Sequence, residues 1–70
     1  MTTKVDLLAA LKLKYEGQRA AAAANLYVYL ERPVGIGEHP DIIQAMDEIL
    51  SKFSEADEKI HAIQSFIKDN

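Results

Sequence analysis

The feature that most constrains the fold is a regular apolar repeat between Ile42 and Ile67. No charged residue interrupts the repeat, which would continue for almost four heptads along a helix. Such a pattern predicts a helix over about 40–68 that lays a narrow apolar stripe against another helix, with a slight left-handed supercoil. The residues of this stripe are spaced alternately by four and three: Ile42, Met46, Ile49, Phe53, Ala56, Ile60, Ile63 and Ile67.

The N-terminal half predicts a second long helix, over about 4–31. Thr3 is a candidate N-cap, and Asp6, three residues later, occupies the position of the acidic partner in a capping box. No proline occurs in this range, and Gly17 weakens the helix by only about 1 kcal/mol relative to alanine. One face follows a 3-4-4 spacing that stays nearly straight along the helix. This face consists of Leu8, Leu11, Tyr15, Arg19, Ala22, Leu26 and Leu30.

Residues 32–39 are expected to connect the two helices, because Pro33 disfavours helix at the preceding residue and Pro40 suits the first turn of a new helix. Antiparallel pairing about this connection places residues whose numbers sum to about 71 opposite one another. Tyr15 then faces Ala56, so that a large side chain meets a small one, as interdigitated packing requires. The predicted fold is therefore an all-α, antiparallel two-helix hairpin that forms a single domain over residues 1–70.

Size and composition predict that the hairpin completes its core by oligomerisation, into a four-helix bundle or a larger assembly. A core built from 70 residues rarely supplies more than roughly 3–5 kcal/mol, and the chain has no cysteine with which to form a disulfide. The first helix is small on every face from Ala20 to Ala24 and apolar on every face from Leu26 to Leu30, which is typical of a helix covered on more than one side. The expected interface residues are Ala20, Ala24, Leu26, Tyr27, Tyr29, Val34 and Ile36.

Arg19 is the one charged residue on the apolar face of the first helix. Its structural interpretation is a side chain that reaches out to solvent, or one that pairs with Glu48 or Glu55 of the second helix, because interior charges are normally paired. Its functional interpretation is an anion site, in which an oligomer brings together Arg19, Lys12 and Tyr15 from several copies to bind a small nucleotide. We expect the structural interpretation.

Several classes of function are disfavoured. A net charge of −3 and a pI near 5.2 argue against a general nucleic-acid binder. No apolar run is long enough to span a membrane, so a soluble, cytoplasmic protein is expected. No nucleophile with a base and no cofactor fingerprint is recognisable, so we expect neither an enzyme nor a bound cofactor. His39 and His61 each lack a third ligand nearby, which argues against a metal site.

The segment from Pro33 to Asp41, with the sequence PVGIGEHPD, follows an alanine-rich helix and precedes an acidic heptad helix. In this it resembles small accessory proteins found in tailed-phage genomes. The resemblance implies a viral protein made in the cytoplasm of an infected bacterium, and it brings no assigned activity or site residues. Some phage anti-defence proteins are also small oligomeric hairpins that sequester nucleotide signals, but that is a similarity of architecture alone.

The sequence thus predicts a non-enzymatic, self-associating interaction protein, a phage accessory protein that acts on a host or viral protein. The alternative is an oligomeric anti-defence sponge that sequesters a small anionic nucleotide.

Overall fold

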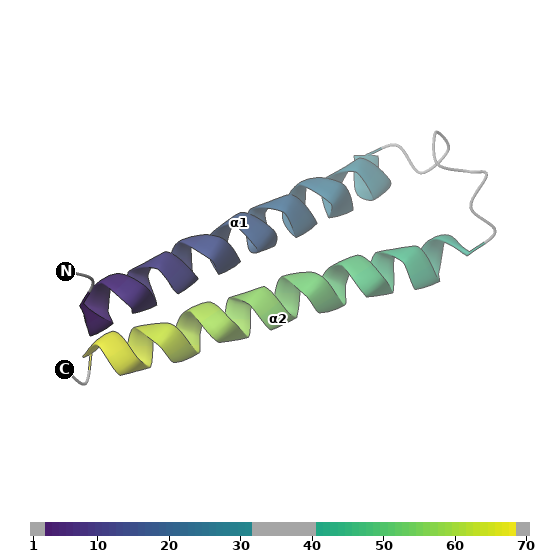
Figure 1. Ribbon diagram of the computed structural model, residues 1–70. Coiled ribbons are helices and arrows are strands. Elements are labelled where there is room, and N and C mark those ends of the chain that lie inside the picture. The colour runs from purple at the N-terminus through teal and green to yellow at the C-terminus, as the bar shows by residue number, and fades with distance from the viewer. Residues whose placement is uncertain (1–2, 32–40, 69–70) are drawn as a thin grey trace.

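The computed structural model describes residues 3–31 and 41–68, and these ranges contain two α-helices and no strand. Helix α1 spans Lys4–Glu31, and helix α2 spans Ile42–Lys68. The helices lie side by side and run in opposite directions, so that the start of α1 and the end of α2 share one end of the molecule (Figure 1). The predicted all-α architecture of two packed helices is confirmed.

The start of α1 is held by a capping box. The backbone N–H of Thr3 donates to Oδ2 of Asp6 at 3.2 Å, and the backbone N–H of Asp6 donates to Oγ1 of Thr3 at 3.1 Å. Each bond satisfies an N–H group that has no partner within the helix. The capping box predicted for these two residues is confirmed, with aspartate in place of the more usual glutamate.

Helix α2 begins at Ile42 rather than at about residue 40, because Asp41 is its N-cap. Oδ1 of Asp41 accepts a hydrogen bond from the backbone N–H of Gln44 at 2.8 Å, and its carbonyl oxygen accepts one from Ala45 at 3.2 Å. A carboxylate is favourable there because it also faces the positive end of the helix dipole. The predicted loop residues Val34 and Ile36, together with His39, lie outside the described residues.

The apolar stripe of α2 faces α1 along its whole length. Every one of its eight residues is buried or half-buried, and Ala56, Ile60 and Ile63 have the lowest exposure. The helix therefore uses the 3.5-residue repeat that its sequence contains, as expected for two helices that cross at a small angle.

The stripe of α1 differs from the predicted one at two positions. Leu11 and Leu30 are exposed, whereas Lys12 and Tyr29 are half-buried toward α2. A helix that stays in contact with a heptad stripe must itself present a 4-3 repeat, and a 3-4-4 line would leave that contact. The stripe that α1 presents consists of Leu8, Lys12, Tyr15, Arg19, Ala22, Leu26 and Tyr29. Lysine fits this position because its aliphatic stem can lie along apolar surface while its ammonium group stays in water.

The register of the two helices also differs from expectation. Tyr15 contacts Lys59 and Arg19 contacts Asp57, so these partners have residue numbers that sum to 74 and 76 rather than to about 71. The partners therefore lie three and five residues further along α2 than predicted, about 4.5 and 7.5 Å along its axis. Two heptad stripes can slide by one turn and still keep apolar residues in contact, so the repeat alone does not select the register.

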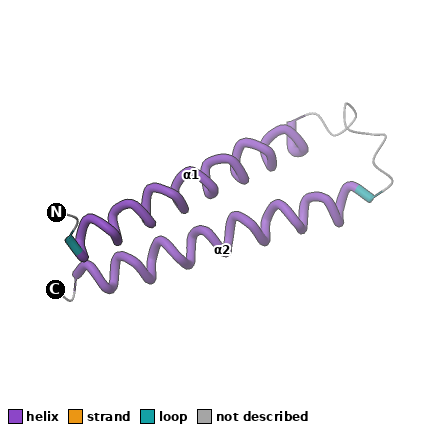
Figure 2. The backbone as a smooth tube through the Cα atoms, in the orientation of Figure 1, coloured by secondary structure: helices purple, strands orange, loops and turns teal. Residues whose placement is uncertain are grey.

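The hairpin is long and has a small core. Its radius of gyration is 15.8 Å, compared with about 11 Å for a compact chain of this length. Four apolar residues are buried in the described part of the chain: Ala22, Ala56, Ile60 and Ile63. Three of them lie in the half of α2 that is distant from the connection. In the view of Figure 2 the space between the helices widens toward the connection, and two grooves lie between the helices in that half of the hairpin.

Candidate interaction surface

Arg19 joins the two helices. Its Nη1 donates to Oδ1 of Asp57 at 2.6 Å, and the two side chains are 33% and 36% exposed. Of the two structural alternatives for Arg19, the ion pair is present, but its partner is Asp57 rather than Glu48 or Glu55. Glu55 instead holds Lys59 on its own helix, at 3.0 Å, and Glu48 accepts a hydrogen bond from Gln44. Asp57 can reach Arg19 because it directly follows Ala56 of the stripe. Its side chain therefore lies beside Arg19 rather than on the outer face of α2.

Asp57 also contacts His61, one turn later on α2. Nδ1 of His61 lies 2.8 Å from the carbonyl oxygen of Asp57 and 3.6 Å from its Oδ2, and the imidazole is largely exposed. In the ranges 3–31 and 41–68, no group of three or more histidine or carboxylate side chains is placed to hold a metal ion. Arg19, Asp57 and His61 therefore form a cluster at the surface that links the two helices.

The ring of Tyr15 is covered by lysine ammonium groups. Nζ of Lys59 lies 4.9 Å from the ring centroid, and Nζ of Lys14 lies 5.5 Å from it. The pKa of Lys59 is raised above its ordinary value, first by the hydrogen bond to Glu55, and then by Coulomb attraction to Glu55 and to the phenolic group of Tyr15. These contacts are cation–π interactions between the half-buried ring and the two ammonium groups.

The three residues of the predicted anion site share the face of α1 that points toward α2. Lys12, Tyr15 and Arg19 are all half-buried along that stripe. Within the hairpin the charge of Arg19 is already neutralised by Asp57. A single chain therefore does not present these three residues as an open cationic pocket.

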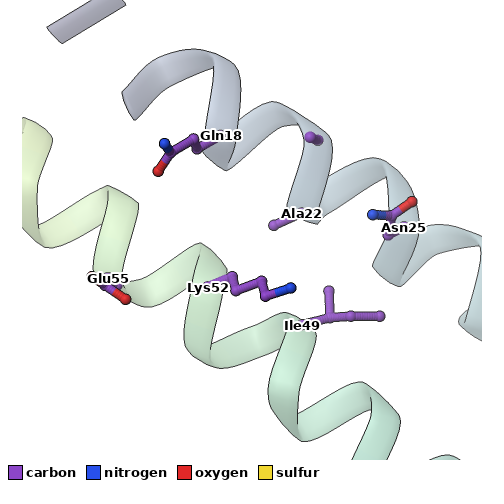
Figure 3. A pocket seen from close by; sticks show the side chains of 7 residues that line it. Gln18, Ala22, Asn25, Ile49, Lys52 and Glu55 are labelled. Carbon is purple, nitrogen blue, oxygen red and sulfur yellow. The ribbon is translucent and has the colours of Figure 1, made fainter. Parts of the chain in front are cut away.

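A polar groove of about 310 Å³ runs between the helices on one flank (Figure 3). Its floor is made of small or apolar side chains, and the side chain of Lys52 extends across it from α2 toward α1. Its rim is exposed and carries both a lysine and a glutamate, which is typical of a solvated flank. The groove is lined by Gln18, Ala21, Ala22, Asn25, Ile49, Lys52 and Glu55.

The other flank carries an apolar groove of about 210 Å³. On a helical wheel Ala23, Tyr27 and Leu30 lie on one side of the α1 stripe, whereas Gln18 and Asn25 lie on the other. The lining residues are Ala23, Leu26, Tyr27, Leu30, Leu50 and Phe53, and none of them is charged.

Ile43 extends this surface toward the start of α2. It precedes Leu50 by seven residues, which places both on the same side of the helix, about 10 Å apart. Ile43 is 76% exposed and Tyr27 is 61% exposed. We call the surface formed by these seven residues the apolar patch: Ala23, Leu26, Tyr27, Leu30, Ile43, Leu50 and Phe53.

The predicted interface residues divide into two groups. Ala20, Ala24 and Tyr27 are exposed on α1, whereas Leu26 and Tyr29 are half-buried toward α2. Sequence reasoning missed the contribution of α2 to the same surface. The sequence signal for this contribution was the pair Ile43 and Leu50. These two apolar residues are one heptad apart and lie next to the α2 stripe rather than on it.

These features define a two-helix hairpin whose α2 is polar on its outer face and whose flank near the connection is apolar and exposed. Neither helix contains a segment apolar enough to cross a bilayer, as far as residues 3–31 and 41–68 are concerned. The chain matches no protein-family model, no curated protein and no solved structure.

Replacing Arg19 with methionine should change the free energy of unfolding by no more than about 1 kcal/mol. The ion pair is one-third exposed, so solvent weakens it, and methionine packs well on the stripe. Asp57 remains one-third exposed and next to His61, so its carboxylate can be hydrated after the arginine is lost. Urea unfolding followed by circular dichroism measures the change. A loss above about 3 kcal/mol would mean that Arg19 stabilises the hairpin in a way that its contact with Asp57 does not explain.

Proposed function

We propose that this protein is a non-enzymatic interaction module that associates with itself and binds a host or viral protein through its helices. The observation that supports this most directly is the imbalance between buried and exposed apolar side chains. Four apolar residues are buried, whereas ten large ones are exposed, in the part of the chain that the structure describes. The exposed residues are Val5, Leu7, Leu11, Leu13, Tyr27, Val28, Leu30, Ile43, Leu50 and Phe66.

The total surface area supports the same proposal. The chain exposes 5474 Å², whereas a compact monomer of 7.8 kDa exposes about 4,400 Å². The excess of about 1,100 Å² is similar to the roughly 800 Å² that one partner loses in a standard protein–protein interface. Extended apolar surface of this kind is characteristic of interaction sites.

The biological setting of the proposal comes from the PVGIGEHPD segment, which resembles tailed-phage accessory proteins. On that basis the protein acts in the cytoplasm of an infected bacterium, where its binding partner is a host or viral protein. A net charge of −3 is consistent with a protein partner rather than with general nucleic-acid binding.

The nucleotide-sponge alternative depends on free positive charge at Arg19. The guanidinium of Arg19 already has a carboxylate partner at 2.6 Å, which disfavours an anion there. We therefore expect no change in the Tm of the wild-type protein with mono-, di- or cyclic nucleotides. A ligand-induced rise in Tm that disappears in Arg19→Met would replace the proposed function with the alternative, because a ligand stabilises the state that binds it.

The proposal is tested by measuring the oligomeric state of the wild-type chain. Sedimentation equilibrium and native mass spectrometry at micromolar concentration should give a dimer or a larger assembly. A stably folded monomer at that concentration would overturn self-association. Native mass spectrometry of protein purified from cells reports, in the same spectrum, any retained small ligand.

A further inference from the structure

We propose that a second copy of this chain docks on the apolar patch, patch against patch about a two-fold axis, and thereby covers the end of the hairpin next to the connection. This inference rests on the proposed self-association and assigns the surface that carries it.

The core of the hairpin is incomplete at the end where the patch lies. On α2 the buried residues begin at Ala56, whereas the four earlier residues of the stripe are only half-buried: Ile42, Met46, Ile49 and Phe53. On α1, Leu26 and Tyr29 are likewise half-buried. These side chains point toward the opposite helix and still remain accessible, so a further layer of side chains would bury them.

The shape of the patch suits contact with an identical patch. Tyr27 and Leu30 protrude from α1, while the small side chain of Ala23 lies beside them and the groove of about 210 Å³ lies between the helices. One surface therefore presents both projecting side chains and the recess that can receive them. This combination suits a two-fold contact, because each surface must serve as the partner of its own copy.

The charge distribution of the patch permits contact with a second copy. The chain has a net charge of −3, so two copies repel one another at long range, although salt screens this repulsion beyond about 8 Å. The eleven residues from Ala20 to Leu30 contain no charged side chain, and neither Ile43 nor Leu50 is charged. An uncharged contact places no like charges opposite one another across the two-fold axis. A basic partner, in contrast, would be attracted to the acidic outer face of α2.

The chemistry of the patch matches the core of a protein interface. Such cores are depleted in charge and enriched in aromatic residues, and tyrosine can pack its ring while keeping its hydroxyl at a wet edge. Tyr27 combines a 61% exposed side chain with a place at the edge of the apolar groove.

The test places a glutamate inside the patch and another outside it. Leu30→Glu and Ile43→Glu introduce a charge at exposed positions of the patch. Leu13→Glu introduces the same charge at the 70% exposed Leu13 of α1, ten residues or about 15 Å along the helix before Ala23, the first residue of the patch. Sedimentation equilibrium gives the dissociation constant of each variant. We expect the two patch variants to weaken self-association at least about 100-fold, because a carboxylate would be buried without a partner. Leu13→Glu should associate like the wild type.

Ile43→Glu is the decisive variant, because it is expected to preserve the hairpin. Ile43 lies in the first turn of α2, where a carboxylate favours the helix dipole, and it has few contacts to lose. Far-UV circular dichroism checks that the helices are retained. A monomeric wild type would overturn both the proposed function and this inference. A wild-type oligomer that persists in Ile43→Glu, or that dissociates in Leu13→Glu, would overturn the patch assignment alone.

Discussion

Replacing Ile60 with alanine should lower the free energy of unfolding by about 2–5 kcal/mol, the typical loss for a fully buried isoleucine. Ile60 is 2% exposed and lies in the stripe between Ala56 and Ile63, where the two helices are packed most closely. A core of this size rarely supplies more than roughly 3–5 kcal/mol in total. The single substitution should therefore remove most of the stability of the hairpin, because the packing around the lost methyl groups cannot fully collapse.

Urea and thermal unfolding followed by circular dichroism measure this loss. All proteins must be compared at one concentration, because self-association adds to the apparent stability. Leu13→Ala, which removes a similar volume from an exposed position of α1, is the matched control and should change stability by less than about 0.5 kcal/mol. His61→Ala, at the exposed position next to Ile60, should also have a small effect. Equal Tm values for Ile60→Ala and these controls would contradict the assignment of the α2 stripe.

The opposite change, from a small to a large side chain, should also be strongly unfavourable at Ala56. Ala56 is 2% exposed and lies beside the Arg19–Asp57 ion pair, where it allows α1 to approach α2. Leucine at this position has no space to occupy unless the helices separate or Arg19 moves. We expect Ala56→Leu to lower the free energy of unfolding by about 1–3 kcal/mol, the usual effect of overpacking a filled core.

Ala62→Leu provides the control for this prediction. Ala62 is exposed on the same helix, so the identical substitution meets solvent rather than α1. Both alanines are replaced by a residue of similar helix propensity, so the difference between the two variants isolates packing. An Ala56→Leu variant that is as stable as Ala62→Leu would mean that the helices are less closely packed at this point than the structure describes.

The sequence alone determined the features that depend on one helix at a time. The stripe of α2 was predictable in full because its apolar residues form a single 4-3 line and the rest of the helix is mostly polar. The capping box of α1 was predictable because a cap involves side chains and backbone groups within one turn. These interactions are local, so the order of residues is sufficient to specify them.

For helix α1, the sequence alone does not determine which line of residues faces α2. From Ala20 to Leu30 it is apolar or small on all sides, so more than one line of residues can face a partner. The sequence favoured a line through Leu11 and Leu30, whereas contact with the heptad stripe of α2 selects a line through Lys12 and Tyr29. The choice is made by the neighbouring helix, and it leaves Leu30 exposed at the edge of the apolar patch.

Only the tertiary structure decided the partner of Arg19 and the composition of the apolar patch. Several carboxylates of α2 lie within a few residues of one another, and the register of the helices brings Asp57, rather than Glu48 or Glu55, to the guanidinium. In the same way, Tyr27 and Leu30 meet Leu50 and Phe53 across the groove because the two helices lie side by side in this register. Contacts between residues distant in the chain depend on how two regular surfaces are placed against each other, and a repeating pattern permits more than one placement.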